Sequence, residues 1–275
     1  MPGPLDGAGS SMGDSGQVIS SAADVYDEFF LPALFSAWAP RVLEAAHLGP
    51  GMRVLDVACG TGVLTIEAAK AVSPGGMTVG IDLNPEMLAV ARRKDSEIEW
   101  RQAAAEMLPL DSDDFDAVVS QFGLMFFKNK EAAIREMWRV LRPGGRLVIA
   151  VWDSLENTPG YAGITALLAR LFGEAMAELL KSPYALGDPR LLRNLLANSG
   201  VKEAEVSCIA GDAHFPSIRS WMHTDVRGWT LAGKLDEDQF EQLVAEAETE
   251  LRSFVTASGS VRFDHPALIA TARKP

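Results

Sequence analysis

The sequence predicts an α/β fold built on a doubly wound, mostly parallel sheet. Short apolar runs alternate with helix-forming stretches through the first half of the chain. The run at residues 54–57 leads into a Gly-x-Gly turn at Gly60 and Gly62, and the run at residues 78–81 ends in Asp82. Alternating strands and helices favour a parallel sheet, because each helix returns the chain to the same sheet edge. Ligands of such sheets bind at the carboxyl ends of the strands.

Five strands are expected in this region, each short, apolar and bounded by turn residues. They are Arg53–Val57, 78–82, 98–103, Phe115–Gln121 and 146–151. Helices are expected between most of them, at Val63–Val72, 85–93 and 130–141. The last helix carries Ile134, Met137 and Trp138 at helical spacing, which predicts a face that packs on the sheet.

The flanking regions predict further helices around this core. Residues 22–47 look helical, with breaks at Pro32 and Pro40. The later segments are expected as helices at 162–180, 189–199 and 236–255, and as strands at 201–209 and 261–273. The chain is therefore divided into a flexible tail at 1–17, a helical segment at 18–48, a core at 49–151 and a C-terminal part at 152–275.

Composition excludes several classes of protein. Of the 275 residues, 48% are hydrophobic, which is ample for a globular core. The net charge of −12 argues against a nucleic-acid partner, because phosphate binding needs clustered Lys and Arg. No apolar run has the length of a membrane span, and the two cysteines form no disulfide framework. We expect a cytoplasmic protein with no metal site; the sequence leaves both a monomer and a homo-oligomer open.

The Gly-x-Gly turn differs from a pyrophosphate-binding loop. That loop has a third glycine, where this chain has Thr65. Asp56 lies inside the first strand, four residues before Gly60. A carboxylate there would repel a pyrophosphate but suits a ligand with an amino or positively charged end. Together with Asp82, which is placed to bind a ribose, the turn predicts a nucleoside site.

These residues resemble the first motif of the class I S-adenosylmethionine-dependent methyltransferases. Residues 103–109 look like the family's GDAExLP segment, and residues 115–121 and 136–149 look like its fourth strand and its last helix, turn and strand. The match spans roughly residues 45–151 and is closest in style to small-molecule methyltransferases of ubiquinone and menaquinone biosynthesis. The chain differs from the family at Ala104, where an acidic residue often binds the adenine amino group.

The resemblance implies a Rossmann-like sheet of seven strands in the order 3-2-1-4-5-7-6, with the last strand antiparallel. Residues 215–260 would then be a helical lid inserted between the last two strands. It also implies S-adenosyl-L-methionine as cofactor and a small, partly apolar methyl acceptor. The expected cofactor-binding residues are Asp56, Ala58, Gly60, Thr61, Gly62, Asp82, Leu83, Ala104, Ala105, Glu106, Gln121 and Tyr26.

The catalytic residues are harder to predict. Methyl transfer from a sulfonium needs chiefly alignment, and a general base only if the acceptor keeps its proton. His214 and His223, with Asp225 nearby, are candidates for that base, and a structural role is the alternative. Several apolar residues are expected either to line a pocket for the acceptor or to belong to the hydrophobic core. They are Trp221, Met222, Trp229, Trp152, Phe122, Met125 and Phe126.

Two other functions are open at this point. One is a nicotinamide-dependent oxidoreductase on a similar sheet, against which the missing third glycine and Asp56 argue. The other is a non-catalytic protein that binds S-adenosylmethionine, which only the departure at Ala104 favours.

Overall fold

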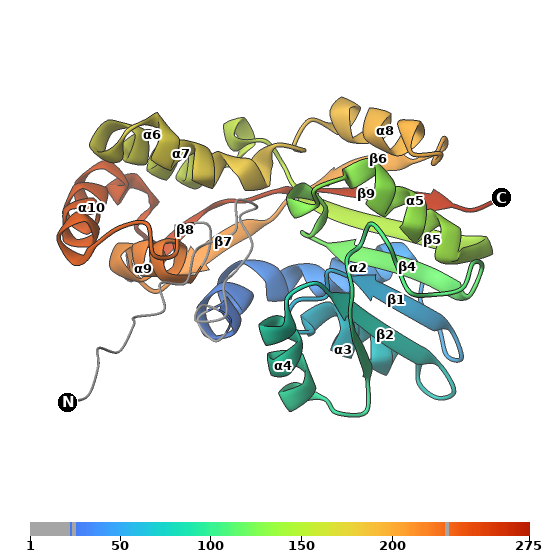
Figure 1. The fold of residues 1–275 in the computed structure, drawn as a ribbon. Helices are drawn as coiled ribbons and strands as arrows, with labels where there is room; N and C mark the ends of the chain where they lie inside the picture. The colour runs from blue at the N-terminus through green and yellow to red at the C-terminus, as the bar shows by residue number, and fades with distance from the viewer. Residues whose placement is uncertain (1–22, 24–25, 229–230) are drawn as a thin grey trace, which may run out of the picture.

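A seven-stranded sheet forms the centre of the computed structural model, which describes residues 23, 26–228 and 231–275 (Figure 1). The predicted tail at residues 1–17 and Trp229 lie outside the described residues. The strand order is β3-β2-β1-β4-β5-β9-β6. The predicted order is therefore confirmed, because the last strand along the chain lies between the fifth and the sixth.

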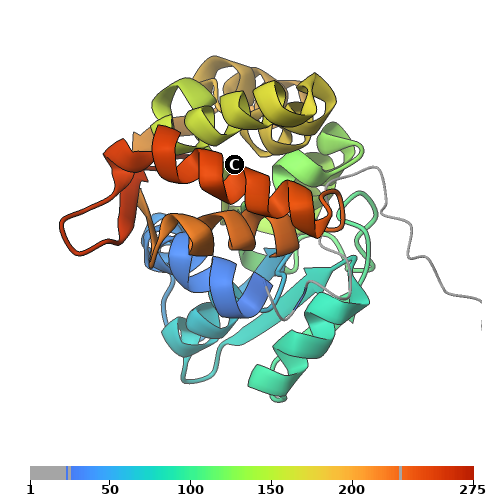
Figure 2. The ribbon, with the colours of Figure 1, turned by 90° about the vertical axis from the view of Figure 1, so that its left-hand side faces the viewer.

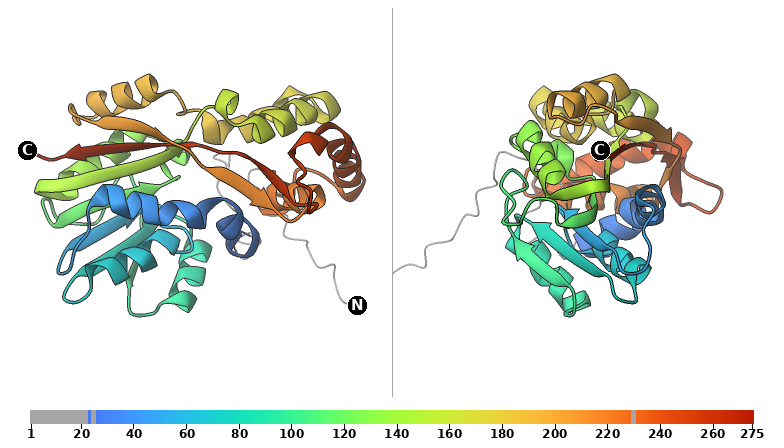
Figure 3. Two further views of the ribbon diagram at one scale, coloured as in Figure 1. Left: turned by 180° about the vertical axis from the view of Figure 1, so that it is seen from behind. Right: turned by 90° about the vertical axis from the view of Figure 1, so that its right-hand side faces the viewer.

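The first five strands are parallel and run through the core. They are β1 (Arg53–Val57), β2 (Met77–Asp82), β3 (Glu99–Gln102), β4 (Phe115–Gln121) and β5 (Leu141–Trp152). Strand β9 (Ala267–Arg273) is antiparallel to both β5 and β6 (Glu205–Ile209), as Figure 3 shows from behind. Parallel strands covered by helices on both faces read as continuous apolar runs, and Val54, Leu55 and Val57 are fully buried.

Helices pack on both faces of this sheet. On one face lie α2 (Ala39–Ala46) and α3 (Val63–Val72), and on the other lie α5 (Lys130–Val140) and α8 (Pro189–Asn198) (Figure 1). Helix α4 (Pro85–Lys94) contacts β2 and β3. In the residues that the structure describes, no helix is both long and apolar enough to cross a membrane.

The C-terminal part differs from the prediction in two segments. The helix expected at 162–180 is divided into α6 (Pro159–Phe172) and α7 (Glu174–Lys181), because Gly173 adopts a φ of 88° between them. The single strand expected at 261–273 is divided into β8 (Val261–Asp264) and β9. Strand β8 pairs instead with β7 (Asp212–Phe215) in a separate two-stranded sheet.

The predicted helical insertion consists of α9 (Ile218–Gly228) and α10 (Glu237–Glu250), which lie between β7 and β8 along the chain (Figure 2). Asp236 caps α10: its carboxylate accepts the backbone N–H of Gln239, whose side chain accepts the N–H of Asp236. Helix α9 and β7 pack against the irregular N-terminal helix η2 (Tyr26–Phe35). The insertion is thus in contact with η2.

Candidate functional site

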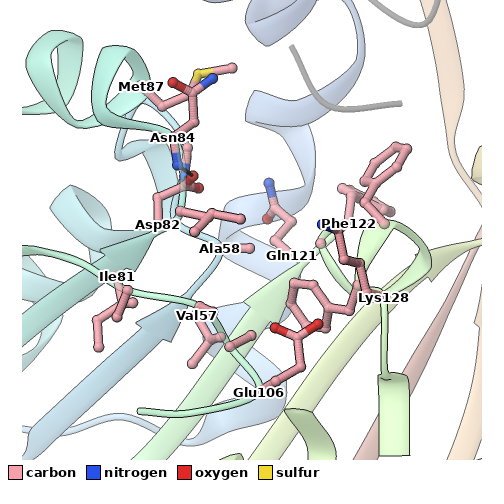
Figure 4. Close-up of a pocket in the computed structure, with 18 of the residues that line it drawn as sticks. Val57, Ala58, Ile81, Asp82, Asn84, Met87, Glu106, Gln121, Phe122 and Lys128 are labelled. Atoms are coloured by element: carbon pink, nitrogen blue, oxygen red, sulfur yellow. Dashed lines mark hydrogen bonds between the residues drawn. The ribbon is translucent and has the colours of Figure 1, made fainter. Parts of the chain in front are cut away.

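A cavity of about 460 Å³ opens at the carboxyl ends of β1, β2 and β4 (Figure 4). Nine of the twelve predicted cofactor-binding residues line it, and they come from the N-terminal helix, the glycine turn, the end of β2, the segment after β3 and the end of β4. They are Tyr26, Ala58, Gly60, Asp82, Leu83, Ala104, Ala105, Glu106 and Gln121.

Asp82 connects the end of β2 to the glycine turn. Its Oδ2 accepts the backbone N–H of Gly60 at 2.8 Å, and its Oδ1 accepts the N–H of Asn84 at 2.8 Å. Burial raises the pKa of the Asp82 carboxyl, while these N–H groups act in the opposite direction. Both oxygens keep further lone pairs, so this fixed carboxylate can still accept hydrogen bonds from ligand hydroxyls.

The two glycines of the turn have different roles. Gly60 has a φ of 55°, and no atom lies within 4 Å of the position where its Cβ would be. Because Gly60 lines the cavity, this empty space is available for close approach of a ligand to the backbone. Gly62 has a φ of 87°, and a Cβ there would lie 2.5 Å from the Trp100 ring. Gly62 and the buried Thr61 do not line the cavity; they form the turn.

Asp56 is fully buried next to this turn and is not part of the cavity lining. Its Oδ2 accepts a hydrogen bond of 2.6 Å from the Thr65 hydroxyl. Its Oδ1 has no partner among the described residues. Burial raises the pKa of the Asp56 carboxyl to about 7, and the nearby charge of Asp82 acts in the same direction. A buried carboxylate oxygen without a donor is suited to an ammonium group.

Two non-glycine residues of the lining have left-handed backbone conformations. Ala58 has a φ of 60° and Phe122 a φ of 55°. This region of φ is uncommon for residues with a side chain, and such strain concentrates at functional sites. The backbone N–H of Phe122 donates to Ala150 O at 2.9 Å, which holds the loop after β4 in place.

Gln121 connects β4 to the N-terminal helix. Its Nε2 donates to the carbonyl of Phe35 at 3.2 Å, and its Oε1 is buried without a partner in the described part of the chain. Aromatic rings stack behind the end of β4. Phe122 stacks on Trp152 with ring centroids 3.6 Å apart, and Trp152 stacks on His265 with ring centroids 4.0 Å apart. This side of the cavity is therefore a packed apolar wall.

Several lining residues were not assigned to the cofactor site from the sequence. They are Val57, Phe35, Ile81, Asn84, Met87, Phe127, Lys128 and Asn129. Asn84 and Asn129 were detectable as the caps that begin helices after β2 and β4, where the N–H groups of Glu86 and Ala132 bond to their side chains. No comparable signal in the sequence distinguishes Lys128.

The candidate catalytic histidines lie elsewhere. His214 is exposed on β7, and His223 is half-buried on α9 with its ring centroid 6.3 Å from that of Phe240. Neither lines the cavity. Of the apolar residues expected around the acceptor, Phe122 and Phe126 line the cavity, whereas Trp221 is fully buried against Phe263. Met125 and Met222 are buried outside the lining, and Trp152 lies behind Phe122.

The residues present fit S-adenosylmethionine. Asp82 offers a carboxylate for ribose hydroxyls, and the space beside Gly60 admits a ligand close to the backbone. The unpartnered Oε1 of Gln121, which lines the cavity, suits the ammonium group of the methionine part, and the buried Asp56 carboxyl lies behind the lining and can act on that group only through its charge. At Ala104, only backbone groups and packing are available to the adenine.

Comparisons with known proteins agree with this geometry. A family model described as a methyltransferase domain matches residues 55–149. A demethylmenaquinone methyltransferase of Staphylococcus carnosus is 32% identical over 209 residues, covering 71% of this chain and 86% of that protein. A ubiquinone/menaquinone biosynthesis C-methyltransferase of Pseudomonas fluorescens is 38% identical over 199 residues, covering 66% of this chain and 77% of that protein.

The fold is also similar to that of solved structures. The crystal structure of a Bacillus halodurans protein described as a methyltransferase superposes on this chain with a TM-score of 0.61 at 20% identity. The match covers 87% of this chain and 99% of that one. At this identity the likeness concerns the fold alone. The sequence match to the Staphylococcus carnosus enzyme, over most of both chains, shows the family. The chain belongs to the class I S-adenosylmethionine-dependent methyltransferases.

Proposed function

We propose that this methyltransferase acts on a small molecule with an apolar, ring-shaped part. The observation that carries the proposal is the composition of the cavity. Its Asp82 side offers polar groups for the cofactor, and its other side is formed by the phenyl rings of Phe35, Phe122, Phe126 and Phe127. Apolar rings stack and pack against aromatic side chains, which gives orientation as well as affinity.

In this proposal the cofactor is held at three points. Asp82 would accept hydrogen bonds from the ribose hydroxyls, and Gln121 would accept one from the ammonium group, which the charge of the buried Asp56 would attract from behind the lining. Residues 103–106 would pack along the adenine. These residues would hold the cofactor in the cavity next to the aromatic wall.

The reaction then depends on alignment. S-Adenosylmethionine supplies an electrophilic methyl group on a positively charged sulfur. The rings of Phe35 and Phe122 hold the acceptor against that methyl and exclude water. Positioning of two reactants contributes about 7–11 kcal/mol to barrier lowering in well-aligned systems. Because transfer needs no redox change, the residues of the cavity have only to bind, orient and exclude solvent.

The names of the two relatives support a small-molecule acceptor, since both are enzymes of quinone biosynthesis. The methylated atom of this protein's acceptor does not follow from those names. A general base is needed only for an acceptor that keeps its proton, and neither His214 nor His223, the candidates from the sequence, lines the cavity.

The test is ligand-dependent stability followed by turnover. S-Adenosylmethionine and S-adenosylhomocysteine should raise the melting temperature, and NADH should not. A ligand at a hundredfold excess over its Kd stabilises the native state by about 2.7 kcal/mol. Release of S-adenosylhomocysteine should then accelerate with small aromatic acceptors. Absence of any shift at millimolar cofactor would contradict the proposal, and binding without turnover across such acceptors would favour a non-catalytic protein.

A further inference from the structure

Lys128 lies on the short loop that connects β4 to α5. The loop is held in place by backbone hydrogen bonds: the N–H of Phe127 donates to Leu124 O at 3.3 Å, and the N–H of Asn129 donates to Glu106 Oε1 at 3.2 Å. Asn129 also caps α5. The backbone that carries Lys128 is therefore fixed relative to the cavity, and its side chain is part of the lining.

The charged side chains of the lining differ in their partners. Asp82 accepts two backbone N–H groups, and Glu106 accepts one. Lys128 is the one cation among the described lining residues, and within the described part of the chain it makes no ion pair or hydrogen bond. By contrast, the neighbouring Lys130 donates to Phe127 O at 3.0 Å and lies outside the lining.

The position of this ammonium group indicates what it can bind. Figure 4 shows Asp82 and Lys128 on opposite sides of the cavity, with Ala58 and Gln121 between them. Lys128 thus belongs to the side formed by the phenyl rings, away from the Asp82 carboxylate. The N-terminus of α5 follows immediately and adds partial positive charge. Lys128 is exposed to solvent, so its attraction for an anion is partly screened.

We propose that Lys128 binds an anionic group, a carboxylate or an ionised hydroxyl, of the methyl acceptor. This inference rests on the proposed function, because it assigns the chemistry of the acceptor that the aromatic wall receives. The other source of a carboxylate is the methionine part of the cofactor. The acceptor is favoured because Asp82, which anchors the cofactor, lies on the opposite side of the cavity.

The first experiment uses matched pairs of anionic and neutral probes. The complex with S-adenosylhomocysteine is titrated calorimetrically with benzoate against benzamide, and with 1-naphthoate against 1-naphthamide. The carboxylates should bind about fivefold or more tightly than the amides, as for one partly shielded ion pair, and added salt should reduce the preference. Lys128→Met should abolish the preference for carboxylates over amides, and the matched control Lys130→Met should keep this preference.

The second experiment separates the two sources of a carboxylate. 5′-Methylthioadenosine lacks the amino-acid part of S-adenosylhomocysteine. Lys128→Met should bind both nucleosides as the parent does. If it loses affinity for S-adenosylhomocysteine but not for methylthioadenosine, Lys128 binds the cofactor's carboxylate and the inference is wrong. It is also wrong if no carboxylate probe binds the parent complex, or if Lys128→Met keeps the preference. A parent that fails to bind S-adenosylhomocysteine contradicts the proposed function instead.

Discussion

The backbone N–H of Gly60 donates a hydrogen bond of 2.8 Å to Oδ2 of Asp82. This bond connects the turn after β1 with the end of the neighbouring strand β2, so that the glycine backbone and the carboxylate face the same cavity. A ligand held by Asp82 is thereby placed against the space that Gly60 leaves open. The Asp82 carboxylate therefore both stabilises the turn and can accept hydrogen bonds from the cofactor.

Asp82→Ala should lower the affinity for S-adenosylhomocysteine by about two orders of magnitude. The substitution removes hydrogen bonds to a charged group, each worth roughly 1.5–3 kcal/mol. It also leaves the N–H groups of Gly60 and Asn84 without their partner. Isothermal titration calorimetry measures the affinity, and urea unfolding checks that the fold survives. Asp111→Ala, at an exposed loop position, is the control. Parental affinity in the Asp82 variant would rule out the ribose contact.

The affinity for the cofactor should depend on pH through Asp56. Burial raises the pKa of this carboxyl to about 7, so the free protein loses the charge as the pH falls through that value. The ammonium of S-adenosylhomocysteine prefers the ionised carboxylate, so its Kd should increase from about pH 8 to about pH 6. Asp56→Asn should bind more weakly and without this dependence.

Methylthioadenosine is the control ligand for this pH dependence, because it has no ammonium group. Its Kd should be flat over the same range in the parent protein. If Asp56→Asn reproduces the parental pH profile for S-adenosylhomocysteine, another group is responsible.

The core of the fold was predictable because its signals are local. Strand β1 and helix α3 have the predicted bounds. Both were predictable because the apolar run of the strand and the glycine turn before the helix consist of consecutive residues. Strand β5 begins earlier than predicted, at Leu141, because Leu141 pairs with Phe115 before an irregularity in the register. That pairing joins residues far apart in the sequence, which periodicity does not reveal.

The site was predictable to a similar degree. Residues next to the motifs, such as Ala58 and Glu106, do line the cavity. Phe35 and Lys128 were missed because they reach the cavity from a helix and a loop whose positions depend on tertiary packing. The hydrogen bond of 3.2 Å between Tyr161 and Asp225, which connects α6 and α9 inside the protein, also depends on tertiary packing and was not predicted. Each appears in the sequence as an isolated polar residue.

That buried pair leads to a prediction on stability. Asp225 is fully buried, and burial raises the pKa of its carboxyl to about 8. The unfolded chain releases this proton above about pH 4, whereas the folded protein keeps it up to about pH 8. The parent should therefore lose stability progressively across this range, by about 1.4 kcal/mol at most per unit of pH from this group.

Asp225→Asn removes this dependence and keeps an oxygen that accepts from Tyr161. The variant should gain stability relative to the parent as the pH rises from about 5 to about 8. Urea unfolding at both pH values measures the difference, and Glu203→Gln, at an exposed position, serves as the control. An equal effect at both pH values would show that the Asp225 carboxyl is ionised in the folded protein.

The last prediction concerns the two histidines of the C-terminal part. Helix α9, which carries His223, packs against η2, whereas the cavity is lined by Tyr26 and Phe35 of η2 itself. His214 is exposed on β7. A base must come within about 3 Å of the proton that it removes, directly or through one water. We therefore expect His223→Gln and His214→Gln to keep kcat within about threefold of the parent and to leave its pH profile unchanged, whereas removal of a general base typically costs about a hundredfold or more. A loss of that size in either variant, with S-adenosylhomocysteine affinity unchanged, would show that α9 or β7 moves to the cavity during turnover and would identify that histidine as the base.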